Sequence, residues 1–301
     1  MTGLKALRAG AVAALVVGLA VGCSPASGGH EGSGRSVLTG ESGTAGPVLA
    51  VKVDNVDAAR PQTGLNDADL VYAIEVEGGL SRLMAVYDSS HLPPTVGPVR
   101  SARETDLQLL AAYDRPALAF SGAQSMLLPV IKGSDLVVRT GTAAFFRSPD
   151  RPAPHNEYVH TKGLTDGAGV AKDIGLRFAP KTPGGGKAVS ATSASMPSAR
   201  FTFTWHAPRY RVAMDGSASP WTADNVIIQR VQVKESRFRS RTGFVPFSQT
   251  VGSGSGVVLR DGRSYDVHWS RPAADAGTTY TADGRTLPLR PGRTWIVLAP
   301  A

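Results

Sequence analysis

Two arginines three residues apart, Arg100 and Arg103, carry the clearest chemical signal in the sequence. They follow Pro98, which fixes its own φ and has no N–H to donate, and they precede a segment with helical apolar spacing. Ser101 with Glu104 three residues later has the pattern of a capping box, which opens a helix. Guanidinium groups beside the free N–H groups of a helix N-terminus favour an anion. The pattern therefore predicts a phosphate or carboxylate site at a loop-to-helix corner.

Acidic side chains before this corner and one histidine after it offer acid–base chemistry. The candidates for catalysis are Asp54, Glu75, Glu77 and His155. Paired carboxylates can act as acid and base on a glycoside, or can hold a divalent cation. These residues would support hydrolysis or group transfer on cell-wall glycan. The competing interpretation is a structural network in which the carboxylates, Asp69 included, neutralise nearby arginines.

Several catalytic classes find no support in the sequence. Residues 252–256 have glycine where a serine hydrolase has its nucleophile, and no Ser-x-x-Lys pair occurs. Residues 184–187 lack the leading glycine and the Ser or Thr of a P-loop. The histidines and the acid at His155, Glu157 and His160 could form a metal site on a loop. The sequence thus predicts no cofactor, with a divalent metal as the alternative.

The N-terminus has the features of a secretory signal peptide. Lys5 and Arg8 precede an apolar run at residues 9–20, and small residues then lead to Cys23. This arrangement resembles a bacterial lipobox, in which the cysteine receives a diacylglyceryl group with acyl chains such as palmitate. Cys23 is the only cysteine, so a cysteine nucleophile is excluded once it is lipidated. We expect a protein anchored to the cell membrane through this lipid, on the extracytoplasmic face.

The elements that must position the candidate residues follow from short apolar runs. A β-branched run at 48–53 predicts a strand. Alternation at the end of 70–76, the turn at Gly78-Gly79 and a second apolar run at 83–87 predict a hairpin. Further strands are expected at 117–120 and 136–139, and helices at 107–114, 125–131 and 161–174. Strands that alternate with helices predict an α+β or α/β domain around a mixed sheet.

After Arg200 the sequence changes to short strands and tight turns. Asp261-Gly262 and Asp283-Gly284 are typical of type I′ hairpins, and strands are expected around them and at residues 225–233 and 294–298. This pattern predicts a smaller all-β module, either a partly open barrel or a sandwich.

Composition divides the chain into segments. We expect a signal peptide at 1–23, a disordered tether at 24–46 that is rich in Gly and Ser, and an N-terminal α/β domain at 47–180. A linker or mobile loop at 181–199 then leads to the C-terminal β-rich domain at 200–301.

The positive charge is concentrated in the last segment. Residues 200–301 hold 14 Lys and Arg against 7 Asp and Glu, whereas residues 24–199 hold 16 against 17. For an extracytoplasmic protein, this balance favours an anionic cell-wall or membrane polymer as partner, and not nucleic acid. A basic face that is merely solvated is the alternative.

These features together resemble a known family. The matching segments are residues 53–55, 59–65, 68–72, 77–82, 97–103, 153–156, 225–226, 251–254, 269–271 and 291–295. They are similar to the YerB-like family of bacterial lipoproteins, which is built on a domain of unknown function. The resemblance implies an envelope location and a two-domain layout, but no established activity.

The sequence therefore predicts an envelope lipoprotein that binds an anionic ligand or polymer at an arginine-rich corner. The alternatives are a cell-wall glycan hydrolase or transferase that uses the acids with His155, and an envelope assembly protein whose protein partner is unknown. The expected ligand-binding residues are Asn55, Arg60, Arg82, Arg100, Ser101, Arg103 and Asn156.

Overall fold

A buried hairpin forms the centre of the N-terminal half, as the alternation of residues predicts. β2 (Leu70–Glu75) and β3 (Ser81–Asp88) pair antiparallel, and β1 (Val48–Asp54) pairs antiparallel with the other edge of β3. β5 (Ala117–Ala119) and β6 (Val137–Arg139) extend the sheet in parallel beyond β1.

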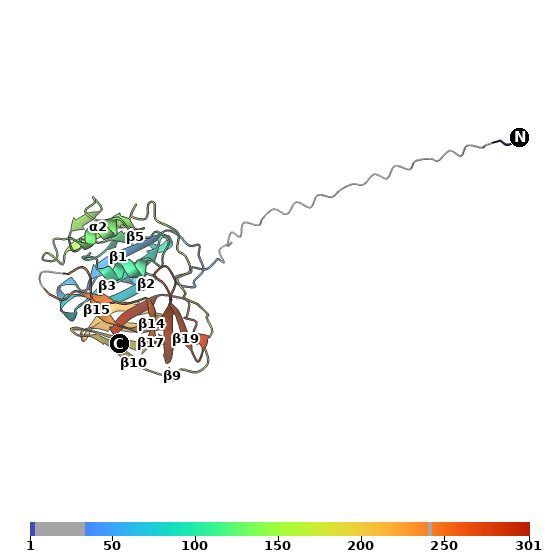
Figure 1. Cartoon of the computed structure of the whole chain (residues 1–301). Coiled ribbons are helices and arrows are strands. Elements are labelled where there is room, and N and C mark those ends of the chain that lie inside the picture. The colour runs from blue at the N-terminus through green and yellow to red at the C-terminus, as the bar shows by residue number, and fades with distance from the viewer. Residues whose placement is uncertain (4–33, 240–242) are drawn as a thin grey trace. The chain divides into compact units, whose positions relative to one another are not determined.

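The computed structural model describes residues 1–3, 34–239 and 243–301. All elements belong to one compact unit, Gly32–Ala301 (Figure 1).

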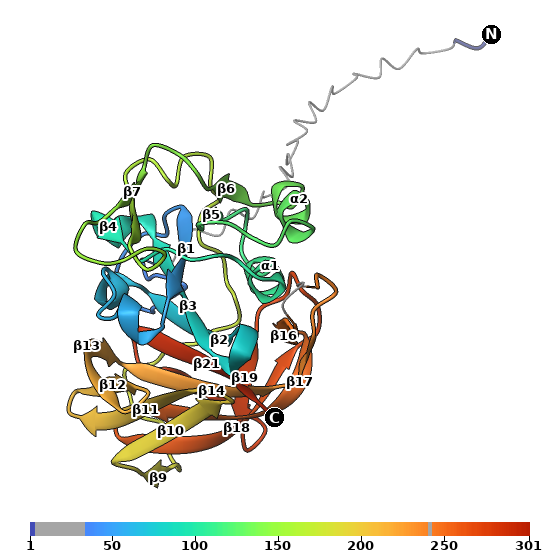
Figure 2. The ribbon, with the colours of Figure 1, turned by 90° about the vertical axis from the view of Figure 1, so that its left-hand side faces the viewer.

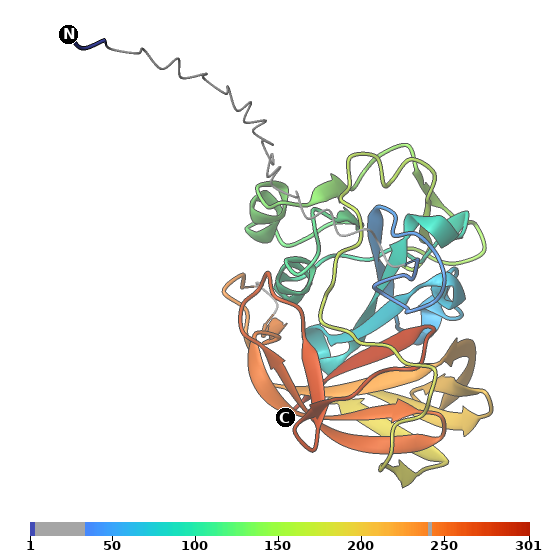
Figure 3. The same cartoon turned by 90° about the vertical axis from the view of Figure 1, so that its right-hand side faces the viewer.

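The sheet continues directly into the C-terminal half. β21 (Thr294–Pro300) lies between β2 and β14 (Asn225–Val231) and is parallel to both. The strand order is β20-β19-β18-β17-β14-β21-β2-β3-β1-β5-β6, with β9 paired to β18. The strands not yet given are β9 (Lys187–Ala188), β17 (Gly252–Arg260), β18 (Arg263–Arg271), β19 (Thr279–Ala282) and β20 (Arg285–Thr286). Figures 2 and 3 show this 12-stranded sheet running through both halves.

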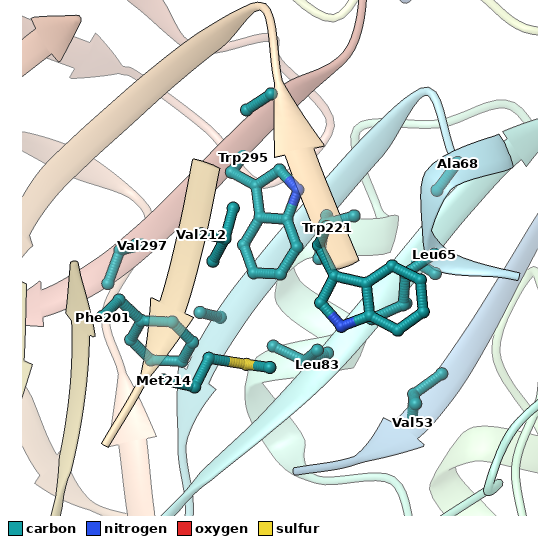
Figure 4. Packing of buried hydrophobic residues seen from close by; sticks show 14 of the residues in the cluster. Val53, Leu65, Ala68, Leu83, Phe201, Val212, Met214, Trp221, Trp295 and Val297 are labelled. Carbon is teal, nitrogen blue, oxygen red and sulfur yellow. The ribbon is translucent and has the colours of Figure 1, made fainter. Parts of the chain in front are cut away.

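A four-stranded antiparallel sheet packs against one face of the large sheet. Its strands are β10 (Ala191–Met196), β11 (Ala199–His206), β12 (Arg209–Met214) and β13 (Ser217–Ala223). Trp295 of β21 is fully buried between the layers, near Phe201 (Figure 4). The ring centroids of Phe201 and Phe203 lie 6.4 and 6.2 Å from that of Trp295. Each such ring contributes about 1.5–3 kcal/mol by burial. The two halves therefore share one core.

The two helices pack on the opposite face of the large sheet, whereas Val96, Phe145 and Val159 of the short strands belong to the same core cluster as the four-stranded sheet. The described residues hold two α-helices, α1 (Glu104–Leu110) and α2 (Leu127–Lys132). The 3-10 helices are η1 (Asp57–Ala59), η2 (Leu65–Asp67), η3 (Glu77–Gly79) and η4 (Ser89–His91). The small sheets are β4 (Thr95–Val96) with β8 (Glu157–His160) and β7 (Phe145–Arg147), and β15 (Val233–Glu235) with β16 (Pro246–Ser248).

Strands predominate over helices, so the α/β expectation for the N-terminal half holds only for its mixed sheet. The helix expected at 161–174 is wrong, because those residues form turns with no helical stretch. Leu164 and Ile174 are nevertheless buried, at 3% and 4% exposure. The apolar residues of this segment are therefore spaced by their packing on the core, and not by the period of a helix.

Within the described part of the chain, no helix is both long and apolar enough to cross a membrane.

Residues 34–46, which we name the N-terminal clasp, are ordered although we expected them to belong to the flexible tether. Leu38 is fully buried, and the N–H of Gly292 donates to the carbonyl of Thr39 at 2.8 Å. Gly40 has a φ of +68°, and a Cβ there would stand 2.4 Å from Phe178. The rest of the tether, with Cys23 and the signal sequence, lies outside the described residues.

The segment expected as a linker, residues 181–199, contains β9 and β10. β10 pairs along its whole length with β11, from Ala191 opposite Thr204 to Met196 opposite Ala199. The Ser, Thr and Ala residues of this segment therefore form an edge strand of the smaller sheet. Small polar residues alternate here with buried ones, which suits a strand that is covered on one face only.

Candidate functional site

Asp54, at the end of β1, anchors the predicted arginine corner. Its side chain is 3% exposed, and its Oδ1 accepts the N–H of Asn55 at 2.9 Å. Its Oδ2 lies 3.0 Å from Nε of Arg100 and 2.8 Å from Nδ1 of His155. The backbone holds Arg100 in place, because its N–H donates to the carbonyl of Lys52 in β1. The structure thus joins three predicted residues that are up to 101 positions apart.

Arg103 forms the second pair of the corner. Its Nε and Nη2 contact the two carboxylate oxygens of Glu77 at 2.7 and 2.9 Å, in the bidentate geometry that arginine favours. Burial opposes ionisation of Glu77, but the hydrogen bonds and charge of Arg103 hold the pKa of this carboxyl below its ordinary value. The pair is partly exposed, at 10% for Arg103 and 29% for Glu77.

The helix N-terminus itself is occupied by the protein's own carboxylate. α1 begins at Glu104 with Arg103 as N-cap, and the N–H of Arg103 donates to Asp106 at 2.7 Å. The capping box predicted for Ser101 and Glu104 is therefore wrong. Ser101 contributes its carbonyl to the corner, and Glu104 accepts the hydroxyl of Ser236. Asp106 was missed as the capping acid because Ser is the commoner N-cap residue.

A buried ion pair lies behind the corner. Nζ of Lys52 is 2.7 Å from Asp106, and both side chains are completely buried. Burial lowers the pKa of Lys52, whereas Asp106 favours its charged form. The sequence offered a signal that we did not use: Lys52 interrupts an otherwise apolar strand, and a lysine is almost never fully buried unless it is paired.

Arg82 is the one guanidinium of the corner that has no carboxylate within 4 Å among the described residues. It stands on β3 opposite Asp54, and its Nη1 donates to the carbonyl of Ser101 at 2.9 Å. Burial, the neighbouring Arg103 and, less strongly, Arg100 lower its pKa to about 10. Every buried nitrogen of Arg82 has a partner, so the N–H groups left over face solvent. The corner therefore carries an excess of positive charge on its open side.

Glu75, a predicted catalytic acid, lies on the other face of the sheet. It pairs with Ser81, whereas Asp54 pairs with Arg82, and neighbouring residues of a strand point to opposite faces. Oε2 of Glu75 is buried without a partner within the described residues, and burial raises the pKa of this carboxyl. Glu75 therefore cannot act together with Asp54.

Three further predicted ligands take part in other contacts. Asn55 donates to Ser81 at 2.8 Å on the same face as Glu75, and accepts Nε2 of Gln62 at 2.7 Å. Arg60 binds the carbonyl of Asn55 and two acids of neighbouring turns, Asp57 and Asp215. Asn156 bonds Arg147 and the carbonyl of Ser148 within its own loop. These residues hold loops to the sheet and do not join the corner.

The histidines proposed as loop metal ligands diverge. His155 contacts Asp54, whereas the exposed His160 lies 3.4 Å from Thr95 and stacks on Phe146. Glu157 lies 3.8 Å from Arg147. In the ranges that the structure describes, no group of three His, Cys, Asp or Glu side chains could hold a metal ion.

Comparisons with known proteins place the chain in a family. The model of the protein family of unknown function DUF3048 matches twice, with its N-terminal domain at residues 33–173 and its C-terminal domain at 189–296. A Bacillus subtilis protein described as "Putative lipoprotein YerB" is 26% identical over 281 residues, which cover 84% of this chain and 81% of that protein. A crystal structure of the YerB protein from the same organism has the same fold, with a TM-score of 0.76 at 22% identity over 89% of this chain and 97% of that one. The predicted resemblance is confirmed, and this chain belongs to the DUF3048 family of proteins of unknown function.

Proposed function

We propose that this protein is a cell-envelope lipoprotein, anchored through Cys23, that binds anionic groups of a wall or membrane polymer at the arginine corner. The corner consists of Arg82, Arg100 and Arg103 with their acids Asp54 and Glu77. The similarity to a protein described as a lipoprotein and the lipobox-like segment before Cys23 support the anchor.

The observation that carries the binding proposal is the charge imbalance of the corner. Three guanidinium groups face two carboxylates, and Arg82 keeps free N–H groups on the solvent side. A like-charged neighbour destabilises a cation, so an anionic ligand would relieve the repulsion between Arg82 and Arg103. A phosphate or carboxylate fits, because a guanidinium binds either group through two parallel hydrogen bonds.

Arg82→Gln is the sharpest test of this proposal, because Arg82 is the corner arginine whose removal leaves no carboxylate unpaired. The full-length chain in detergent would be titrated with glycerol phosphate polymer and, separately, with vesicles containing phosphatidylglycerol. We expect R82Q to weaken binding at least about tenfold, the share of one charge-assisted bidentate contact. Binding should also weaken with added salt.

Arg285→Gln is the matched control. Arg285 is exposed on β20 and its side chain makes no hydrogen bond or ion pair among the described residues, so R285Q removes the same charge elsewhere. Equal affinities of R82Q and R285Q would assign binding to the basic C-terminal half and contradict the proposal. Preference for the polymer over the vesicles, or the reverse, distinguishes the two sources of phosphate.

A second candidate function, hydrolysis or transfer on cell-wall glycan, rests on the pair of Asp54 and His155. A carboxylate on Nδ1 orients the imidazole and leaves Nε2 free to accept a proton, which is the arrangement of a general base. His155 is 22% exposed, so Nε2 has a path to solvent.

This candidate makes its own prediction. Full-length protein incubated with purified wall glycan should release products, and His155→Gln should abolish their release while the polymer affinity of the arginine corner persists. Chromatography of the soluble fraction is the measurement. No product with or without divalent metals would dismiss the enzyme and leave the binding proposal intact.

A further inference from the structure

A separate cavity of about 220 Å³ opens at the other end of the β2–β3 hairpin. The arginine corner adjoins the turn after Glu75, whereas this cavity adjoins Asp69, just before β2 begins. Its walls come from the N-terminal clasp, from the loop before β2, from His91 after β3, and from the C-terminal residues Arg209, Asp224 and Arg293. We name it the seam cavity, because both halves of the chain line it.

Two opposite charges meet at the seam cavity without pairing. The N–H of Thr294 donates to the carbonyl of Asp69 at 3.0 Å, so Asp69 and Arg293 leave the backbone at adjacent positions. Their charged groups nevertheless lie more than 4 Å apart, since no ion pair joins them in the described part of the chain. Both side chains line the seam cavity, so each presents there a charge that the other does not neutralise.

Arg293 is held back by neutral acceptors. Its Nε donates to the carbonyl of Ala68 at 3.2 Å, and its Nη1 contacts Asn66 at 3.0 Å and Thr222 at 3.1 and 3.2 Å. Nη2 takes no bond within the described residues and remains accessible. The protein therefore fixes the guanidinium through Nε and Nη1, and Nη2 is the nitrogen left for a ligand.

Asp69 is held in the same way on its side of the cavity. Its Oδ2 accepts the N–H of Asp88 at 2.6 Å, while Oδ1 has no partner among the described residues and remains accessible. Burial, with the nearby carboxyls of Asp88 and Glu41, raises the pKa of Asp69 to about 7, although the N–H of Asp88 and the imidazole of His91 act in the opposite direction. A positive group beside Asp69 would stabilise its ionised form.

The remaining charges around the seam cavity favour a ligand with a cationic end. Asp224 is already 3.1 Å from Arg209, whereas Glu41 and Asp67 have no ion pair in the described ranges. These acids do not converge as metal ligands, since the described residues contain no cluster able to hold a metal. A simple anion would meet repulsion from them, and a simple cation would leave Arg293 unmatched.

We propose that the seam cavity binds a small zwitterion of the free amino-acid class, with its ammonium group on Asp69 and its carboxylate on Arg293. At about 220 Å³ the cavity is smaller than the about 300–1,000 Å³ that drug-sized ligands occupy, so it suits a molecule of amino-acid size. Such a ligand bridges the loop before β2 and the start of β21, and so binds both halves of the chain. This inference is independent of the proposed function of the arginine corner.

Calorimetric titration of the full-length chain in detergent tests this proposal. The probes are glycine, L-alanine and D-alanine as zwitterions, ethylammonium as a cation and acetate as an anion. We expect at least one zwitterion to bind with a Kd of about 1 mM or tighter, and at least about tenfold better than ethylammonium or acetate. Asp69→Asn keeps an acceptor for the N–H of Asp88 and should weaken that binding at least about tenfold by removing the charge.

Asp283→Asn is the control, because Asp283 has a φ of +48° in an exposed turn and asparagine tolerates that conformation. The proposal is overturned if no zwitterion binds, if ethylammonium or acetate binds equally well, or if D69N binds like the unaltered protein. Should D69N fail to fold, Glu41→Gln decides: this exposed side chain makes no bond in the described chain, and its loss should weaken binding two- to fivefold. Unchanged affinity in E41Q would then overturn the proposal.

Discussion

At the scale of single residues, the arginine corner is partly architecture and partly open chemistry. Arg100 and Arg103 neutralise Asp54 and Glu77, as the structural interpretation of the sequence expected. Arg82 departs from that interpretation, because it gains only a carbonyl partner among the described residues. The residue types predicted an arginine-rich site, but only the structure shows which of these arginines is paired with a carboxylate.

The buried pair behind the corner yields a first prediction. Lys52→Met should lower the free energy of unfolding by about 3–5 kcal/mol, because it leaves Asp106 as an uncompensated buried charge. Adding Asp106→Asn should restore part of that loss, since asparagine is neutral and still accepts the N–H of Arg103. Denaturant titration measures both variants. A cost below about 1 kcal/mol for the single change would contradict the prediction.

A second prediction at this scale concerns pH. The folded pKa of Asp69, about 7, exceeds its ordinary value of 3.8, so the fold favours the protonated carboxyl. Its contribution to stability is complete below the ordinary pKa and is lost as the pH rises through 7. The stability of Asp69→Asn relative to the unaltered protein should therefore rise over this interval, by at most about 4 kcal/mol, and then level off. Thermal melts of both proteins between about pH 4 and pH 8 measure it, and a difference that stays constant would refute it.

At the scale of elements, the local sequence pattern predicted the central strands well, but it predicted the segments that connect and cover them poorly. The apolar runs of β1, β2 and β3 were sufficient, because all three strands are buried on both faces and have nearly continuous apolar sequences. The helix expected at 161–174 failed because buried Leu164 and Ile174 belong to turns that pack on the core. Tertiary packing, and not helical periodicity, placed these apolar residues.

The candidate site shows the same limit. Glu77 lies in η3, between β2 and β3, where it reaches the arginine corner. Glu75 is still part of β2, and the alternation of that strand places it on the opposite face of the sheet. His155 reaches Asp54 across 101 positions, and no local signal encodes that contact. The N-terminal clasp was missed for a related reason: Gly and Ser are typical of tethers, and Leu38 is the one large apolar residue of the segment that is fully buried.

At the scale of the whole molecule, the two family segments share one sheet. β21 fills the gap between β14 and β2, and Trp295 of this strand fills the core between the two layers. We therefore expect a single cooperative unfolding transition for both halves. Circular dichroism and tryptophan fluorescence should report the same midpoint.

Truncation tests this shared architecture. A chain that ends at Arg293 exposes the edges of β2 and β14, so it should lose cooperative unfolding and aggregate. A chain that ends at Pro300 keeps β21 complete and serves as the control. Size-exclusion chromatography with thermal melts separates the outcomes. A monomeric, cooperatively folded product from the first truncation would show that the N-terminal segment folds alone.

The position of β21 also has a consequence for biogenesis. A polypeptide leaves the ribosome or an export channel from its N-terminus, so β2 emerges with one edge unpaired more than two hundred residues before its parallel partner is made. That edge stays unpaired until Thr294–Pro300 follows, so we expect the nascent chain to depend on chaperones. By the same logic, a nonsense codon late in the gene would be as damaging as an early one.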